Sequence, residues 1–269
     1  MTEERRVPTI TFDSNVWRVI VSPDAFPKDS EIQAAKRVNS AIQLGRAEGR
    51  LSETVFTLEG VQRADRKEYL ARYKPEQRVS ISDSRGRGKI DVQFTIAAST
   101  IGHPGNSPYL SKHLQDALAL RFRLMKCPRF GSPKNPDIND AWYVAQPEAA
   151  VVERLKRIGE TLQALEARGS GIAKIESIGK KYATQRQTWF DGLGNAPVSL
   201  AGEVASAVAE WADADSIAAH VGYGNDYFCT RDEGRAGGAA SALAPASRAW
   251  LTSTYALRFV SISELASLV

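Results

Sequence analysis

Short apolar runs alternate with amphipathic stretches along this chain, and the alternation predicts strands that alternate with helices. Runs rich in β-branched and apolar residues predict strands at residues 7–12, 54–58, 78–82, 90–97, 121–127, 226–230 and 258–262. Apolar residues at helical spacing predict helices over residues 34–45, 148–167, 199–224 and 248–255 and within 173–187, with Ser111 capping a helix to residue 120 and Ser263 capping a closing one. Short apolar strands between helices are typical of a three-layer α/β/α fold with a mostly parallel central sheet.

The chain has no internal repeat and no low-complexity segment, so we expect one domain over residues 1–269. Residues 65–200 exceed what a minimal core of this type needs, and we expect them to contain an inserted or elaborated region. Net charge differs along the chain: residues 1–60 sum to −1, residues 61–190 to +10 and residues 191–269 to −5, which gives the overall +4. A basic middle predicts an anionic partner, although a solvated lysine and arginine surface would have the same composition.

The composition is 43% hydrophobic and 25% charged, which is ordinary for a globular chain and argues against a disordered or collagen-like one. No apolar run approaches the roughly 18 residues of a membrane span, and the N-terminus lacks the apolar core of a signal peptide. We therefore expect a cytoplasmic protein without a membrane partner. Cys127 and Cys229 are expected to be reduced thiols, and the cysteines and three histidines lack zinc-ligand spacing.

Carboxylates occur where predicted strands end, and their positions carry most of the functional argument. Asp13, Glu59 and Asp232 follow strand-like runs, while Asp213 stands at the start of a helical turn, near an expected break in the 199–224 helix. The carboxyl ends of parallel strands form the ligand crevice of an α/β sheet, and carboxylates gathered there repel one another unless a cation lies between them. Hard oxygen ligands select Mg²⁺ or Mn²⁺, which can promote hydrolysis of a phosphodiester.

Each of these acids also has a simpler interpretation. An acidic residue after a strand is often only a helix N-cap. Glu53 competes with Glu59 for the second position, and Asp215 competes with Asp213 for the third. Asp226 is interpreted as a structural residue that bonds the backbone of its own turn.

Several segments resemble PIN-domain ribonucleases. Residues 10–16, Ile-Thr-Phe-Asp-Ser-Asn-Val, resemble the family's opening strand, which runs into D-[ST]-[NS]-V. Residues 213–232 resemble its C-terminal signature of an Asp that opens a helix, small apolar residues, Gly-x-Asp, a hydrophobic strand and Thr-x-Asp. Residues 52–59 and 255–265 are similar to the family's middle strand and to its final strand and helix, whereas residues 65–200 depart from the family pattern.

The resemblance implies a PIN-like, metal-dependent endoribonuclease that hydrolyses RNA phosphodiester bonds. By it, the catalytic, metal-binding acids would be Asp13, Glu59, Asp213 and Asp232, holding Mg²⁺ or Mn²⁺, with Ser14, Asn15 and Thr230 as candidates to hydrogen-bond them. It implies RNA as the partner, with single-stranded DNA as the alternative. An inhibitory protein, as for toxin members of the family, and a homodimer also stay open.

The basic middle offers two groups of cations for nucleic-acid binding. Arg85, Arg87 and Lys89 lie on a glycine-bearing turn. Arg121 and Arg123 belong to a second group that continues through Lys126 and Arg129, interleaved with the aromatic residues Phe122 and Phe130. The aromatic rings either stack on single-stranded bases or belong to the core.

Two other functions compete with the nuclease. A catalytically silent PIN-like module that only binds nucleic acid would have nearly the same sequence. A phosphatase of the haloacid dehalogenase type would use Asp13 as nucleophile, but it needs a second acid where this chain has Asn15.

Overall fold

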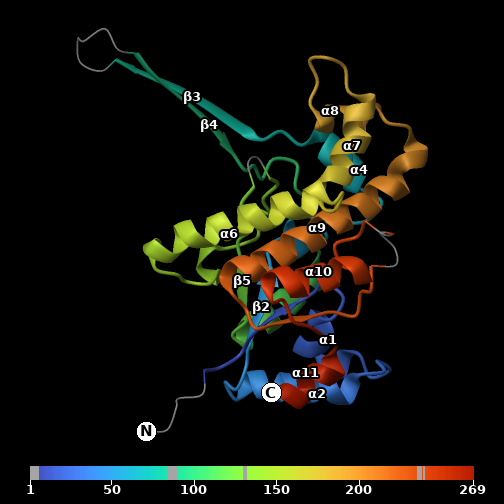
Figure 1. The fold of residues 1–269 in the computed structure, drawn as a ribbon. Coiled ribbons are helices and arrows are strands. Elements are labelled where there is room, and N and C mark those ends of the chain that lie inside the picture. The colour runs from blue at the N-terminus through green and yellow to red at the C-terminus, as the bar shows by residue number, and fades with distance from the viewer. Residues whose placement is uncertain (1–5, 84–89, 130–131, 235–237, 239) are drawn as a thin grey trace.

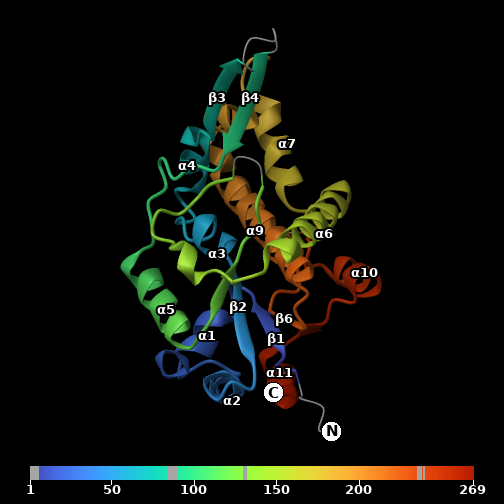
Figure 2. The ribbon, with the colours of Figure 1, turned by 90° about the vertical axis from the view of Figure 1, so that its left-hand side faces the viewer.

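The computed structural model describes residues 6–83, 90–129, 132–234, 238 and 240–269. At its centre is a parallel sheet of five strands in the order β5-β2-β1-β6-β7 (Figures 1 and 2). The strands are β1 (Thr9–Phe12), β2 (Glu48–Ser52), β5 (Arg123–Met125), β6 (Tyr227–Cys229) and β7 (Phe259–Val260). A parallel sheet needs helical crossovers and is therefore covered on both faces.

Side chains alternate along β1 and separate the two faces of the sheet. Ile10 and Phe12 pack into a core with Trp17, whereas Thr11 faces the other way and bonds His220. The first face is covered by α1 (Trp17–Val21), α2 (Ile32–Gln43), α5 (Pro108–Ala119) and α11 (Ile262–Leu268). The second is covered by α6 (Glu148–Ala167), α9 (Ala201–Tyr223) and α10 (Pro245–Tyr255). The predicted α/β class, with helices on both faces of a parallel sheet, is confirmed.

Helix α9 joins this sheet core to a second, wholly helical core. At 23 residues it is about 35 Å long. Its C-terminal half packs on the sheet, and its N-terminal half packs against α4 (Arg66–Arg72), α7 (Ile172–Tyr182) and α8 (Trp189–Asn195) around Trp211. The short helix α3 (Thr54–Thr57) lies where the two cores meet. Gly224, at φ +65°, ends α9 in the left-handed conformation that glycine adopts without strain.

A two-stranded antiparallel ribbon extends away from both cores (Figures 1 and 2). It consists of β3 (Glu76–Asp83) and β4 (Ile90–Ala97), which pair with each other in their own sheet. Val79 and Phe94 face each other across it and are 61% and 58% exposed. Short 3₁₀ turns complete the described elements: η1 (Pro23–Ala25), η2 (Asp140–Trp142) and η3 (Val198–Leu200).

Three sequence expectations about elements were wrong. Residues 54–57 form helix α3 rather than a strand, and the strand of that region is β2, which ends at Ser52. Helix α9 runs without a break, so Asp213 lies near its middle instead of opening a helical turn. Helices α5 and α11 also begin earlier than expected, because Ser107 and Ser261, rather than Ser111 and Ser263, accept the capping hydrogen bonds.

The span of residues 65–200 is not separate from the central sheet. It contains β5 and α5, which belong to the sheet layer and its cover, as well as the ribbon and most of the helical core. None of the helices within the described residues combines the length and the apolar character needed to cross a membrane.

Candidate functional site

Asp13 lies directly after β1, at the carboxyl edge of the sheet. Its backbone N–H donates to the Cys229 carbonyl at 3.0 Å, which extends the β1–β6 pairing by one residue. Its buried carboxylate accepts hydrogen bonds from Ser14 N at 2.7 Å, from Asn15 Nδ2 at 2.9 Å and from Thr230 Oγ1 at 2.5 Å. These three donors fix the orientation of the carboxylate.

Thr230 connects Asp13 to Asp232 across the sheet edge. While its hydroxyl donates to Asp13, its Oγ1 accepts from the Asp232 N–H at 2.9 Å. One Asp232 oxygen accepts from Gly234 N at 2.7 Å. The two acids that are 219 positions apart in the sequence therefore share a hydrogen-bonded neighbour.

Glu59 comes to the same edge from the loop after α3. Ser14 Oγ donates to Glu59 Oε1 at 3.1 Å, while the Ser14 N–H donates to Asp13. Arg66 holds this loop in place, because its guanidinium donates to the carbonyls of Glu59, Val61 and Ala205, each at 3.1 Å. The bond to Ala205 ties the loop to α9.

Asp213 approaches the cluster from α9. The Thr54 hydroxyl donates to the Ala212 carbonyl at 3.3 Å, so α3 touches α9 beside this residue. Because α9 packs on both cores, its middle passes over the carboxyl edge of the sheet, and Asp213 is half-buried there.

The four acids form one electrostatic cluster. Burial raises the pKa of three of them. The pKa of Asp13 is raised, that of Glu59 is raised to about 7, and that of Asp213 is raised well above its usual value. The charge of Asp13 further raises the pKa of Glu59 and Asp213, and Asp232 acts in the same direction on Asp13 and Asp213. Arg66 acts in the opposite direction on Glu59. Concentrated negative charge of this kind would be relieved by a bound cation.

The donor chemistry of the cluster fits a hard divalent cation, because carboxylate and hydroxyl oxygens are what Mg²⁺ and Mn²⁺ prefer. Among the described residues, however, no group of three or more acids, histidines or cysteines is arranged so that it could hold a metal ion. The side chains would therefore have to turn toward a common point to coordinate one.

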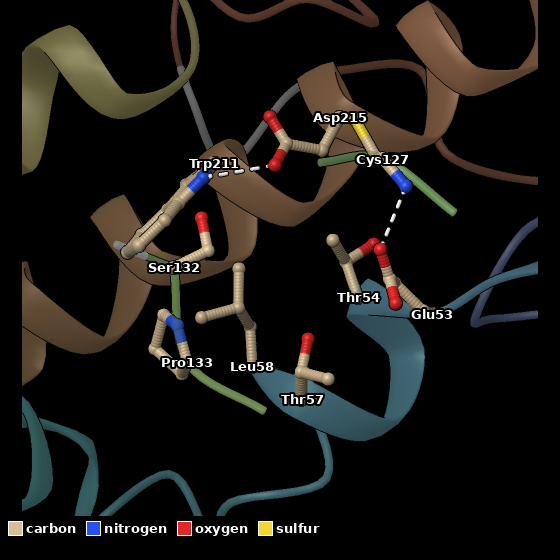
Figure 3. A pocket seen from close by; sticks show the side chains of 9 residues that line it. All are labelled: Glu53, Thr54, Thr57, Leu58, Cys127, Ser132, Pro133, Trp211 and Asp215. Atoms are coloured by element: carbon tan, nitrogen blue, oxygen red, sulfur yellow. Dashed lines mark hydrogen bonds between the residues drawn. The ribbon is translucent and has the colours of Figure 1, made fainter. Parts of the chain in front are cut away.

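The competing acids Glu53 and Asp215 have other partners (Figure 3). Glu53 accepts from Cys127 N at 2.7 Å and from the Tyr143 hydroxyl at 2.6 Å. Asp215 accepts from Trp211 Nε1 at 3.0 Å and from Arg129, which also pairs with Glu166. A cavity of only about 20 Å³ lies between them, room for about one water molecule. Both acids thus serve a buried network that holds β5 and its following loop to α9.

The structure also adds residues that the sequence analysis did not single out. Glu210, buried one turn before Asp213 on α9, accepts from Ala242 N and further raises the pKa of Asp213. The sequence could have indicated it, because residues three apart on a helix, such as Glu210 and Asp213, lie on the same face. Arg248 on α10 bears one buried guanidinium nitrogen without a hydrogen-bond partner among the described residues, and its charge acts on Asp13. Nothing in its sequence context marked it.

Asp226 is structural, but its partner differs from the one expected. It accepts from Thr9 N at 2.8 Å and Thr9 Oγ1 at 3.0 Å, and it pairs with Arg6. The residue therefore ties the chain before β6 to the start of β1 instead of bonding its own turn.

Those predicted nucleic-acid-binding cations that the structure describes are not gathered at the acidic cluster. Arg85, Arg87 and Lys89 lie outside the described residues, as does Phe130. Arg121 and Arg123 lie at the beginning of β5, separated from β1 by β2, whereas Asp13 follows the end of β1. Lys126 and Arg129 pair with Asp140 and with Asp215 and Glu166. Phe122 is 1% exposed and packs on Phe12, so it belongs to the core and is unavailable for base stacking.

Comparisons with protein-family models, with curated proteins and with solved structures found no match to this chain.

Proposed function

We propose that this protein is a metal-dependent nuclease with a PIN-like fold, and specifically an endoribonuclease. The observation that carries the proposal is that Ser14 and Thr230 link Asp13 with Glu59 and Asp232 at the carboxyl edge of a parallel sheet, with Asp213 close enough for their charges to raise its pKa. Four chain segments deliver these acids, and the charges of Arg66, Arg18 and Arg248 offset their repulsion only in part, because the pKa values of Asp13, Glu59 and Asp213 stay raised. A structural role alone does not explain such an arrangement, since buried acids are ordinarily paired.

In this proposal the four carboxylates would hold Mg²⁺ or Mn²⁺. The bound ion would supply the positive charge that favours attack by water on the phosphodiester and departure of the leaving oxygen. The chain's own residues prepare the site. Thr230, Asn15 and Ser14 orient Asp13, and Ser14 also orients Glu59. No serine or cysteine nucleophile is required, and both cysteines are buried free thiols, in keeping with the proposed cytosolic location.

The test compares cleavage of single-stranded RNA by the purified wild type with that by Asp13→Asn and Asp232→Asn, in Mg²⁺ or Mn²⁺. Each substitution should lower the rate about a hundredfold or more, because it removes a ligand and a negative charge from the site. Asp24→Asn is the matched control, since Asp24 is an exposed acid paired with Lys36. Equal activity in wild type and both site variants would contradict the proposal.

The alternative, a catalytically silent module that binds nucleic acid, gives a different result in the same assay. It predicts retention of RNA by the wild type and no cleavage of RNA or DNA with either metal. Single-stranded DNA in parallel reactions distinguishes a ribonuclease from a general nuclease.

A further inference from the structure

A cleft of about 250 Å³ opens beside the acidic cluster. Glu59 of that cluster lines it together with Ser14, which donates to Glu59. The polar and aromatic lining also includes Arg18, Arg66 and Tyr109, and the remaining lining residues are apolar or small. The walls come from α1, from the loop after α3 and from the start of α5. A ligand in this cleft would therefore lie directly next to the proposed reaction centre.

Arg18 brings to the cleft a cation whose charge acts on Glu59 but whose guanidinium has no hydrogen-bond partner among the described residues. It is half-buried and forms no ion pair within the described part of the chain. Its neighbour is the ring of Tyr109, with the guanidinium carbon 5.8 Å from the ring centroid. Arg66 differs, because each of its three guanidinium nitrogens donates to a backbone carbonyl. A guanidinium with free donors in a cleft is suited to a phosphate.

Tyr109 brings an accessible aromatic ring. It is 51% exposed, and the ring of His113 meets it edge to face at a centroid distance of 4.5 Å. His113 is itself buried and packs against Trp17 and Phe26. The contact with His113 thus holds the ring, while about half of the Tyr109 residue is exposed, which suits contact with a base.

Gly60 keeps the cleft open. A Cβ at this position would come within 2.6 Å of the Phe56 carbonyl oxygen and 3.1 Å of Leu110 Cδ2. The absence of a side chain lets the loop after Glu59 run close to α3 and α5, which leaves the space in front of it free.

We propose that this cleft binds one unpaired nucleotide of a single-stranded nucleic acid, with Arg18 on a phosphate and Tyr109 stacked on the base. The inference rests on the proposed nuclease function and specifies its substrate, because a base held in the cleft cannot be paired in a duplex. Its position beside Glu59 places that nucleotide next to the bond to be cleaved.

Binding can be measured separately from cleavage by fluorescence anisotropy of a short labelled oligouridylate in EDTA. Arg18→Gln and Tyr109→Ala should each weaken binding about tenfold, while Tyr109→Phe keeps the ring and should bind like the wild type. Arg46→Gln is the control for loss of one positive charge, because Arg46 is exposed and lies before β2, at the other end of the sheet.

A second probe tests the stacking directly. An abasic oligomer of equal length should bind the wild type more weakly than oligouridylate does, and Tyr109→Ala should abolish that difference. No binding by the wild type, equal binding of an RNA duplex, or unchanged affinity in Arg18→Gln and Tyr109→Ala would overturn the inference. If the wild type cleaves RNA and the affinity of Arg18→Gln and Tyr109→Ala is unchanged, the nucleotide-binding role of the cleft is refuted and the nuclease function is not. If binding depends on the base but no cleavage occurs, the nuclease function is refuted and the binding role of the cleft is not.

Discussion

At the scale of single residues, two pairs of acids near one another in the sequence have opposite surroundings. Glu53 and Asp215 each accept hydrogen bonds from more than one partner, and Asp215 pairs with Arg129. For Glu59 and Asp213, by contrast, the charge of Asp13 is, after burial, the largest cause of a raised pKa. A buried acid that repels its neighbours lowers stability, so its presence points to a role other than holding the fold.

This contrast predicts opposite effects on stability. The Glu59 pKa of about 7, above its usual 4.5, means that the charged form is disfavoured in the folded state. Glu59→Gln should therefore raise the free energy of unfolding at pH 8 by about 1 to 3 kcal/mol. Asp215→Asn should lower it by about 3 kcal/mol, because it leaves Arg129 buried with one partner fewer. Urea denaturation measures both, and destabilisation by Glu59→Gln would contradict this assignment.

A buried histidine predicts sensitivity to acid. His220 Nδ1 lies within hydrogen-bond distance of the Thr11 hydroxyl, at 2.9 Å, and that hydroxyl also accepts from Asn225 Nδ2. Burial lowers the His220 pKa from 6.5 to about 3. Since the unfolded state binds the proton first, stability falls as pH drops below about 6.5, by about 2 kcal/mol at pH 5.

The variant His220→Asn keeps a hydrogen-bonding group near the position of Nδ1 but does not titrate. Its free energy of unfolding, measured between pH 5 and pH 8, should lose the part of the pH dependence that belongs to this histidine. Identical slopes in variant and wild type would show that His220 does not carry the effect.

At the scale of elements, the sequence pattern predicted those strands and helices that bury one regular face in the core. The β-prone run at residues 7–12 predicted β1, and the amphipathic pattern predicted α6, which runs from Glu148 to Ala167 as expected. Helix α3 was missed because its β-branched residues favour a strand, yet the backbone turns after Ser52, where the Ser52 and Thr54 hydroxyls bond each other.

The candidate site was partly predictable for the same reason. Asp13 and Asp232 follow strands whose parallel pairing brings them to one edge, and this can be inferred from sequence. The position of Asp213 at the site depends on α9 packing against both cores. The contact of Arg18 with Tyr109 depends on where α5 lies. Contacts of this kind, between segments far apart in the chain, leave no local pattern.

A close contact between β2 and the residue before β5 predicts a coupled pair. A Cβ on Gly49 would lie 2.5 Å from the ring of Phe122, so Gly49→Ala should destabilise the protein by about 1 to 3 kcal/mol. In a Phe122→Leu background the same substitution should cost less, since the ring is gone. Thermal unfolding of the wild type, the two single variants and the double variant measures the coupling. If the two losses of stability simply add in the double variant, the contact between Gly49 and Phe122 is contradicted.

At the scale of the whole molecule, α9 packs in both cores and so connects them, whereas the β3–β4 ribbon forms a sheet of its own. The ribbon strands contact chiefly each other, and residues at its middle are exposed. Its base is held by the Tyr73 hydroxyl, which donates to the Ser132 carbonyl and accepts from Ser99 N. The ribbon beyond that base should therefore contribute little to global stability.

Shortening the ribbon tests this independence together with the role of the basic turn. Val79 and Phe94 are opposite each other in the register, so replacing residues 80–93 by Asn-Gly joins them through a two-residue hairpin turn. The thermal midpoint should stay within about 2 °C of the wild type, because the core residues of the described part of the chain lie outside 80–93. The deletion also removes Arg85, Arg87 and Lys89, so RNA affinity should fall and depend less steeply on salt concentration. Titrations of labelled RNA at several salt concentrations give the slope. An unchanged slope would mean that the basic turn does not contact phosphates, and a large fall in midpoint would mean that the ribbon supports the fold.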